Sequence, residues 1–489
     1  MKISDELIRG IKASFVSRIV HVVTNGLLVV LLAGVLLGPD EYGLLFLVIS
    51  IVAVAQLFAD LGIARSASRY VSEFKEVNPS QVPHILASSL RYRFILIVVV
   101  CVALLFGRNF IASILDEPRL GALLVLGALF LAFQSLKVYH VTLFQGFNQV
   151  EYSALISIVD NVARITLIVA FVAVGWGVVG ALIGYVVSSV LAAILALVVL
   201  YVRFYRTYER AEQPEPGIRR RILEYSIPLT ASQSANVIDR RVDILLVGFF
   251  LNPAAVGFYT LGKQISDFIE APAGSVGFAL SPVYSEEKAN DQIERASRLY
   301  ETSLKYVLLL YVPAVVGLIL VAEPMILIIF GEAYAAAIPV LQILSIFVLF
   351  RAINGITTQA LDYLGRARHR AIVKGVTSGA NFGLNLLLIP TMGVVGAALA
   401  TVVTFGVYSM ANVYIMNLEL SLDWTRILRI ASMATAVSLV MGAVVVVFTA
   451  YISGLLSLIA VVGVGVAIWA LLASASGLLD LRQVASVMT

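Results

Sequence analysis

The chain has 489 residues, of which 60% are hydrophobic and 13% are charged, with a formal net charge of +4. Soluble domains carry about 25% charged residues, so this composition excludes an ordinary soluble protein and predicts a polytopic membrane protein. A single cysteine, Cys101, excludes a disulfide framework or a cysteine-based metal site within one chain. We expect no metal and no cofactor. In a membrane protein, basic residues are explained first by the orientation of the chain in the bilayer. We therefore do not expect nucleic acid as a partner.

Apolar runs occur along the whole chain, and a helix needs roughly 20 such residues to cross a bilayer. The runs are continuous rather than alternating, which predicts helices and not a barrel. The first run is too long for the apolar core of a signal peptide, so it is predicted as a span. About fourteen spans are predicted, over residues 13–37, 43–64, 85–107, 119–142, 150–173, 177–201, 223–250, 256–280, 303–330, 336–360, 371–390, 394–417, 427–450 and 453–479.

Basic residues collect in every second loop between these spans. If the N-terminus is cytoplasmic, the cytoplasmic loops hold Arg65, Arg69, Lys75, Arg203, Arg206, Arg210, the "RRR" of 219–221, Arg295, Arg298, the "GRARHR" of 365–370, Arg426 and Arg429. The opposite loops hold little beyond Arg108 and Arg119. Positive charge stays on the cytoplasmic side, so we expect a multi-pass protein of the cell membrane with both termini in the cytoplasm.

Two pairs of segments show an internal repeat. "GVVGALIGYVVS" at 177–188 recurs as "GVVGAALATVVT" at 393–404, and "GPDEYGLLFLV" at 38–48 corresponds to "NPAAVGFYTLG" at 252–262. The pattern predicts an N-terminal lobe of six helices at 1–201, a cytoplasmic linker at 202–222, a C-terminal lobe of six helices at 223–417, and two additional helices at 418–489. Two parallel repeats around a pseudo-two-fold axis, with a central cleft, are typical of alternating-access transporters.

The segment "LLGPDEYGLLFLVISIVAVAQLFADLGIARSASRYVSE" at 36–73 resembles the opening of the polysaccharide-transporter family, the oligosaccharide-lipid flippases. "NVIDRRVDILLVGFFLNPAAVGFYTLG" at 236–262 is similar to that family's second-half equivalent. The family lies in the multidrug/oligosaccharidyl-lipid/polysaccharide exporter superfamily. The resemblance implies a flippase, not an enzyme, that turns a polyprenyl-phosphate-linked oligosaccharide from the cytoplasmic to the outer leaflet. It also implies partners: the bilayer, the lipid-linked glycan, H⁺ or Na⁺ as coupling ion, and glycan-assembly enzymes.

Ionisable groups inside spans are expensive, so they should face a polar cleft or one another. The first span places Arg18, His21 and Asn25 on one helix face, and the seventh places Asn236, Asp239 or Arg240, and Asp243 on one face. Two alternatives stay open: Arg18 as an interfacial anchor, and the charges of the seventh span as a self-neutralising cluster that locks packing.

Other spans offer fewer polar positions. Lys263 and Asp267 can pair along the eighth span, ahead of Glu270 and of Pro272, which predicts a kink. Asp160 and Arg164 can pair in the same way in the fifth span, and the amides of Asn381 and Asn385 can bind sugar or a neighbouring helix. The predicted substrate-binding residues are Arg18, His21, Asn25, Arg164, Asn236, Arg240, Lys263, Arg351 and Asn381. The residues predicted to hold a coupling ion or balance charge are Asp239, Asp243, Asp267 and Glu270.

Arginine is favoured for a phosphate linkage because its guanidinium stays charged and binds phosphate bidentately. Two rival functions remain. A multidrug or cation antiporter of the same fold should have an acidic, aromatic cleft, whereas several arginines occur here. A membrane glycan polymerase or transferase would need long outer loops with acidic or histidine residues, and the predicted outer loops are short.

Overall fold

The computed structural model of the chain describes residues 2–270 and 292–479. In these ranges the chain forms helices joined by turns and short loops, without a strand. Eleven described segments are long and apolar enough to cross a membrane, and one of them, 150–205, contains two helices. The prediction of a multi-pass, all-helical membrane protein is therefore confirmed. Two compact units divide the chain, Met1–Gly257 and Phe258–Thr489, and each is described by itself.

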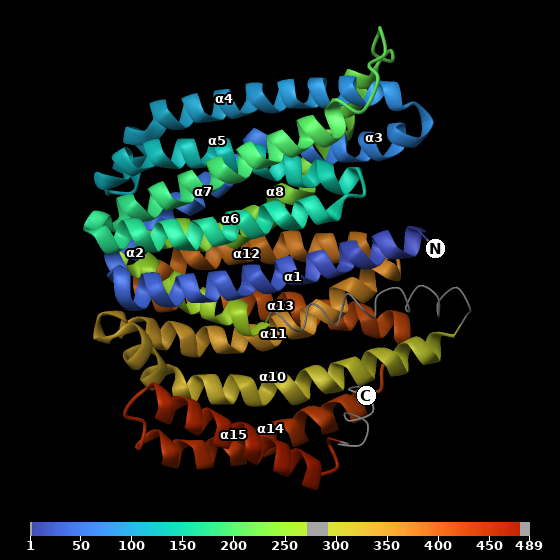
Figure 1. Ribbon diagram of the computed structural model, residues 1–489. Helices are drawn as coiled ribbons and strands as arrows, with labels where there is room; N and C mark the ends of the chain where they lie inside the picture. The colour runs from blue at the N-terminus through green and yellow to red at the C-terminus, as the bar shows by residue number, and fades with distance from the viewer. Residues whose placement is uncertain (1, 271–291, 480–489) are drawn as a thin grey trace. The chain divides into compact units, whose positions relative to one another are not determined.

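Helices of the first unit run side by side, coloured blue to green in Figure 1. They are α1 (Lys2–Leu31) with the π-helical turn Leu32–Leu36, α2 (Pro39–Asp60), α3 (Ile63–Val77), α4 (Val82–Ile114), α5 (Arg119–Gly146), α6 (Val150–Phe171), α7 (Gly177–Leu200) and α8 (Ile218–Phe250). Pro39 suits the first turn of α2 because the N–H groups of that turn have no acceptor within the helix, so proline's missing N–H costs nothing. The adjacent Asp40 and Glu41 place negative charge at the positive end of the helix dipole.

Helix α3 lies where the sequence predicts only a cytoplasmic loop. Its apolar residues recur at steps of three and four, and Ala67, Tyr70, Val71 and Phe74 are buried in a cluster that also contains Ile222 of α8. This periodicity is the signal that would have found α3. An amphipathic helix too short and too polar to span the membrane covers the ends of its neighbours here.

The predicted linker is anchored to the corner between α3 and α4. The Gln81 amide donates to the Gln213 carbonyl at 3.1 Å and accepts from the Glu215 backbone N–H at 2.8 Å, while His84 Nε2 lies 2.8 Å from the Ala211 carbonyl oxygen. Helix α8 follows and packs on α2, α3 and α4. The compact units consequently divide after Gly257, not at 202–222. The compact units are defined by contacts between residues, whereas the lobes 1–201 and 223–417 are defined by the sequence repeat. The lobes therefore stay predictions.

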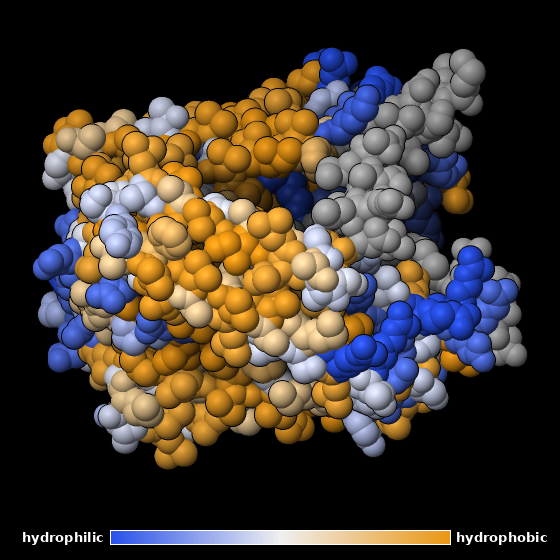
Figure 2. Space-filling model, turned by 90° about the horizontal axis from the view of Figure 1, so that it is seen from below, coloured by the Kyte–Doolittle hydropathy of each residue, from blue (hydrophilic) through white to orange (hydrophobic). Residues whose placement is uncertain are grey.

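The second unit begins within the helix over 253–270, which extends from the first unit. It continues with α10 (Ile293–Phe330), α11 (Ala337–Tyr363), α12 (Ala367–Met392), α13 (Val394–Leu420), α14 (Trp424–Thr449) and α15 (Leu455–Ala475). Helices α14 and α15 are the two predicted C-terminal additions. Figure 2 shows that apolar side chains dominate the face over these two helices, with hydrophilic ones toward its two ends, as a membrane-facing surface requires.

Two glycines bring the corresponding repeat motifs into contact. A Cβ added to Gly43 of α2 would lie 1.7 Å from the Pro253 carbonyl oxygen, and one added to Gly257 would lie 2.3 Å from the Pro39 carbonyl oxygen. Each motif therefore places its glycine against the backbone that follows the other motif's proline. Only glycine permits backbones to approach this closely.

We expect Gly43→Ala to lower the thermal unfolding temperature of the purified protein, because overpacking costs about 1–3 kcal/mol. The matched control is Gly107→Ala on α4, where nothing beyond the adjoining turns of its own helix backbone lies within 4 Å of the added Cβ. The control should unfold like the unaltered protein. Equal unfolding temperatures for both variants would show that the contact is not tight in the membrane.

Candidate functional site

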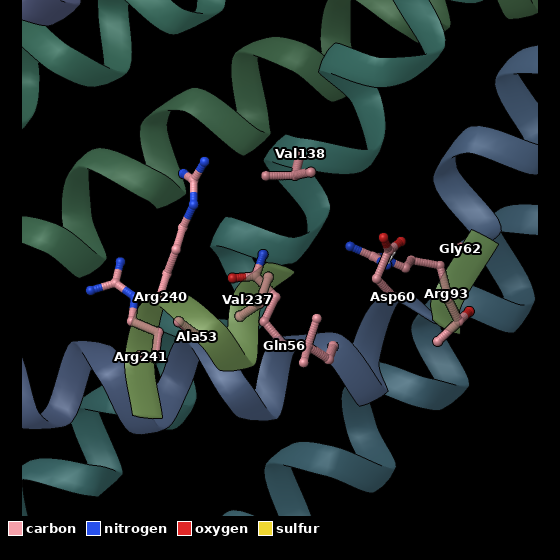
Figure 3. A pocket seen from close by; sticks show the side chains of 11 residues that line it. Ala53, Gln56, Asp60, Gly62, Arg93, Val138, Val237, Arg240 and Arg241 are labelled. Atoms are coloured by element: carbon pink, nitrogen blue, oxygen red, sulfur yellow. Dashed lines mark hydrogen bonds and ion pairs between the residues drawn. The ribbon is translucent and has the colours of Figure 1, made fainter. Parts of the chain in front are cut away.

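A cavity of about 310 Å³ opens in the first unit among α2, α4, α5 and α8. It is lined by Ala53, Gln56, Leu57, Asp60, Gly62, Arg93, Val138, Thr230, Val237, Arg240 and Arg241. Figure 3 shows Arg240 and Arg241 side by side on α8, and Asp60 beside Arg93. The lining thus combines three guanidinium groups with one carboxylate.

The carboxylate is already neutralised within this lining. Arg93 of α4, whose side chain is fully buried, donates to the Asp60 carboxylate at the end of α2 and to the Ser135 carbonyl of α5 at 3.0 Å. The other two charged side chains of the lining, Arg240 and Arg241, are both positive. Sequence reasoning missed Arg93 and Asp60. The signal that could have found them is their position: Arg93 lies inside the predicted third span and Asp60 inside the predicted second span, where ionisable residues are rare.

Helical spacing explains why α8 turns two arginines toward the cavity. Val237, Arg240 and Arg241 are three and four residues apart, so they share one face. Asp243 instead is buried, with 2% of its surface exposed, and Asp239 is half-buried. The charges of the "DRRVD" segment are therefore divided: both arginines reach the cavity lining, and Asp243 lies in the packed interior.

A second charged cluster joins α5 and α6. Lys137 Nζ lies 2.7 Å from Asp160 Oδ2, and Arg164 donates to the same oxygen. The predicted pairing of Asp160 with Arg164 along the helix is confirmed, whereas Lys137 was missed. The Arg164 guanidinium lies 5.4 Å from the centre of the Tyr185 ring of α7.

Part of the polar face of α1 lies against α6. His21 Nδ1 lies 3.3 Å from Asn161 Oδ1, and the Asn25 amide donates to the His21 carbonyl at 2.8 Å. Arg18, one turn earlier, is exposed. The face predicted from spacing is real, and the structure shows that His21 contacts the helix that carries Asp160 and Arg164. Substrate contacts from Arg18, His21 and Asn25 stay predictions.

In the second unit one arginine is shared by two carboxylates. Arg351 of α11 donates to Asp267 and lies 2.9 Å from Glu270, and its guanidinium is 5.4 Å from the centre of the Phe347 ring. The Lys263 ammonium lies 5.6 Å from the centre of the Tyr259 ring. Sequence spacing suggested Lys263 as the partner of Asp267, but a helix further along the chain supplies Arg351. The roles predicted for Asp267 and Glu270, binding a coupling ion or balancing charge, stay predictions.

The predicted amides of the second unit bond across and along helices. Asn381 donates to Thr404 Oγ1 of α13 at 3.2 Å, and Asn385 donates to the Asn381 carbonyl at 3.0 Å. The neighbouring-helix alternative therefore describes the contacts of Asn381, and its role toward sugar stays a prediction. The side chain of Asn236 and the predicted kink at Pro272 lie outside the part of the chain that the structure describes.

Among the residues described, no three or more His, Cys, Asp or Glu side chains are grouped so that they could hold a metal ion. Two guanidinium groups, those of Arg240 and Arg241, lie in the cavity lining of the first unit. Guanidinium and ammonium groups at a partly water-excluded surface bind phosphate through short, charge-assisted hydrogen bonds.

Comparison with known proteins gives a family match over more than half of the chain. The family model described as polysaccharide biosynthesis protein matches residues 32–339. The probable flippase AglR of Haloferax volcanii is 25% identical over 380 residues, which cover 77% of this chain and 76% of that protein. The probable low-salt glycan biosynthesis flippase Agl15 of the same organism is 25% identical over 208 residues. That match covers 42% of this chain and less than half, 43%, of Agl15.

Solved structures confirm the transporter fold. An inward closed conformation of the lipid II flippase MurJ has a TM-score of 0.74 at 17% identity and covers 96% of this chain and 98% of its own. An inward-facing multidrug resistance transporter of the MATE family has a TM-score of 0.66 at 17% identity, covering 82% and 94%. At these identities the likeness shows the fold alone.

Proposed function

Because the chain belongs to the polysaccharide biosynthesis protein family, we propose that it is a flippase for a polyprenyl-phosphate-linked oligosaccharide. It moves this lipid from the cytoplasmic to the outer leaflet by alternating access, for the assembly of a cell-surface polysaccharide or glycoprotein glycan. Relatives named flippases and the lipid II flippase fold support this proposal. The proposed activity breaks no covalent bond, so the protein is not an enzyme.

One observation carries the proposal: the positive cavity of the first unit. Arg240 and Arg241 line it, and its single lining carboxylate, Asp60, is bound by Arg93. A polar head group cannot cross hydrocarbon, so a flippase must offer it a polar site of opposite sign. Two adjacent arginines provide the positive charge that binds the phosphate linkage, which is negatively charged at any physiological pH.

The cation antiporter is the second candidate, because a multidrug transporter shares the fold. A site for cationic drugs needs unpaired carboxylates facing the cavity, since a cation is repelled by a guanidinium surface. The cavity lining has the opposite sign. A glycan polymerase or transferase would need a catalytic constellation, which neither the sequence nor the relatives' names indicate.

The test is the leaflet distribution of lipid-linked glycan in cells that lack the protein. We expect the glycan to accumulate in the cytoplasmic leaflet and to reach the outer leaflet again when the gene is restored. Unchanged glycan distribution together with increased sensitivity to cationic drugs would favour the antiporter. Measuring export in the restored cells after collapse of the proton gradient or of the Na⁺ gradient identifies the coupling ion. Co-purification with the protein identifies any glycan-assembly enzymes.

Orientation is a separate prediction, from the basic loops. A reporter that is active only in the cytoplasm should be active when fused after Arg370 or after Thr489, and silent when fused near Asn252. Both termini then lie in the cytoplasm. Activity of the fusion near Asn252 would invert the proposed orientation, and with it the assignment of the cytoplasmic side.

A further inference from the structure

The charged cluster of α5 and α6 has more cations than its carboxylate can neutralise. Lys137 and Arg164 both bind Asp160, and the exposed fractions of these side chains are 10%, 16% and 2%. Both bonds end on Oδ2, while Oδ1 is buried without a hydrogen-bond partner. Arg164 Nε is likewise buried without a partner. Two cations thus share one carboxylate oxygen, and a donor and an acceptor in the same cluster are left unsatisfied.

This arrangement is weaker than the alternative open to the same residues. An arginine that faces a carboxylate by itself can form two parallel hydrogen bonds, one to each oxygen. In the structure Arg164 does not form this pair: it shares Oδ2 with Lys137, while its own Nε and Asp160 Oδ1 lack hydrogen-bond partners. A surplus positive charge in a nearly dry environment is unfavourable until an anion arrives. The bond between Arg164 and Asp160 should therefore break readily when another anion becomes available to Arg164.

Of the two cations, Arg164 is the one that also contacts a group other than Asp160. Its guanidinium lies over the Tyr185 ring of α7, 5.4 Å from the ring centre. Lys137 is the more enclosed of the two, on α5 next to Val138, which lines the cavity. A phosphate held by Arg240 and Arg241 would attract the Arg164 guanidinium away from Asp160. The Asp160 carboxylate would remain neutralised by Lys137 alone.

We propose that Lys137 is a positioning residue for transport, which keeps Asp160 neutralised so that Arg164 can exchange between this carboxylate and the phosphate or diphosphate of the substrate. The proposal rests on the proposed flippase function and adds a substrate-releasing step to it. Asp160 takes Arg164 back when the phosphate leaves. Lys137 itself does not touch the substrate.

Two single variants should shift anion affinity in opposite directions. In Lys137→Met, Asp160 keeps Arg164 as its only counter-ion, so the dissociation constant should rise by about tenfold, the effect of one lost charge-assisted hydrogen bond. Lys137→Arg should bind as the unaltered protein does, because the charge is retained. In Asp160→Asn, Arg164 is free for the anion, so binding should tighten while transport slows, since nothing draws the arginine back.

The double variant Lys137→Met/Asp160→Asn separates positioning from direct contact. If Lys137 only positions, the double variant should bind the anion at least as tightly as the unaltered protein. A lysine that acts only through Asp160 should also leave the double variant equal to Asp160→Asn alone; weaker binding by the double variant than by Asp160→Asn would show direct contact between Lys137 and the phosphate, and that result overturns the proposal. The double variant also removes one positive and one negative charge together, so it is expected to fold even if Asp160→Asn alone does not.

The measurement is binding of a short-chain isoprenyl diphosphate, and of inorganic diphosphate, to the purified full chain in lipid nanodiscs. Binding of both probes assigns recognition to the phosphate groups, and binding of only the first adds the lipid. Lys12→Met on α1, at an exposed lysine, is the control and should change neither constant. Unchanged affinity in Lys137→Met overturns the proposal about Lys137. Failure of the unaltered protein to bind either probe contradicts the proposed function itself.

Discussion

Replacement of Arg240 by alanine should leave the protein in the membrane at normal abundance and lower glycan export by at least about tenfold, because a phosphate contact from a charged donor is lost. Arg240 lines the cavity and is exposed, so its removal creates no buried void. Arg240→Lys should keep part of the activity, since the charge remains but the bidentate geometry is lost. Export by leaflet is measured beside protein abundance on immunoblots.

The control for Arg240→Ala is Arg220→Ala on the same helix. The Arg220 side chain is 83% exposed and pairs with Glu224, so its removal should change neither abundance nor export. A packing role for the α8 charges makes a different prediction. Arg240→Ala would then deplete the protein, and the double change Asp239→Ala/Arg240→Ala would restore abundance and export together. Normal export by that double variant would show that Arg240 does not bind the substrate.

The largest effect on stability is expected at Arg93. Arg93→Met removes a fully buried arginine and leaves Asp60, whose side chain is 20% exposed, without this partner; the cost should approach, and not exceed, the roughly 3–5 kcal/mol of a one-sided break in a fully buried ion pair. The protein should unfold at a much lower temperature in detergent and be depleted in cells. Arg93 also donates to the Ser135 carbonyl, so a second acceptor is left without its donor.

Two further variants check this explanation. Arg93→Met/Asp60→Asn replaces both charges and should recover most of the lost stability, because no charge remains uncompensated. Arg91→Met, at an exposed arginine two residues earlier on α4, should unfold normally. If Arg93→Met keeps its unfolding temperature but loses export, then Arg93 serves the substrate in the cavity and not the packing of α4.

Several conclusions depended only on local sequence. The length and continuity of the apolar runs predict a helical membrane protein, because the hydrocarbon core demands about 20 residues per crossing and satisfied backbone hydrogen bonds. The pairing of Asp160 with Arg164 follows from the geometry of one helix. The family resemblance of the segments 36–73 and 236–262 agrees with the family match over residues 32–339.

The tertiary structure decided which helices are neighbours, and therefore which charges meet. Lys137 comes to Asp160 from α5, Arg93 comes to Asp60 from α4, and Arg351 reaches Asp267 across 84 residues of sequence. Local spacing cannot give these pairs, because a helix face is defined by periodicity while its partner depends on how helices pack. The repeat motifs show the same division. Sequence identified their prolines and glycines, but only packing shows that Gly43 and Gly257 are needed because the two backbones touch.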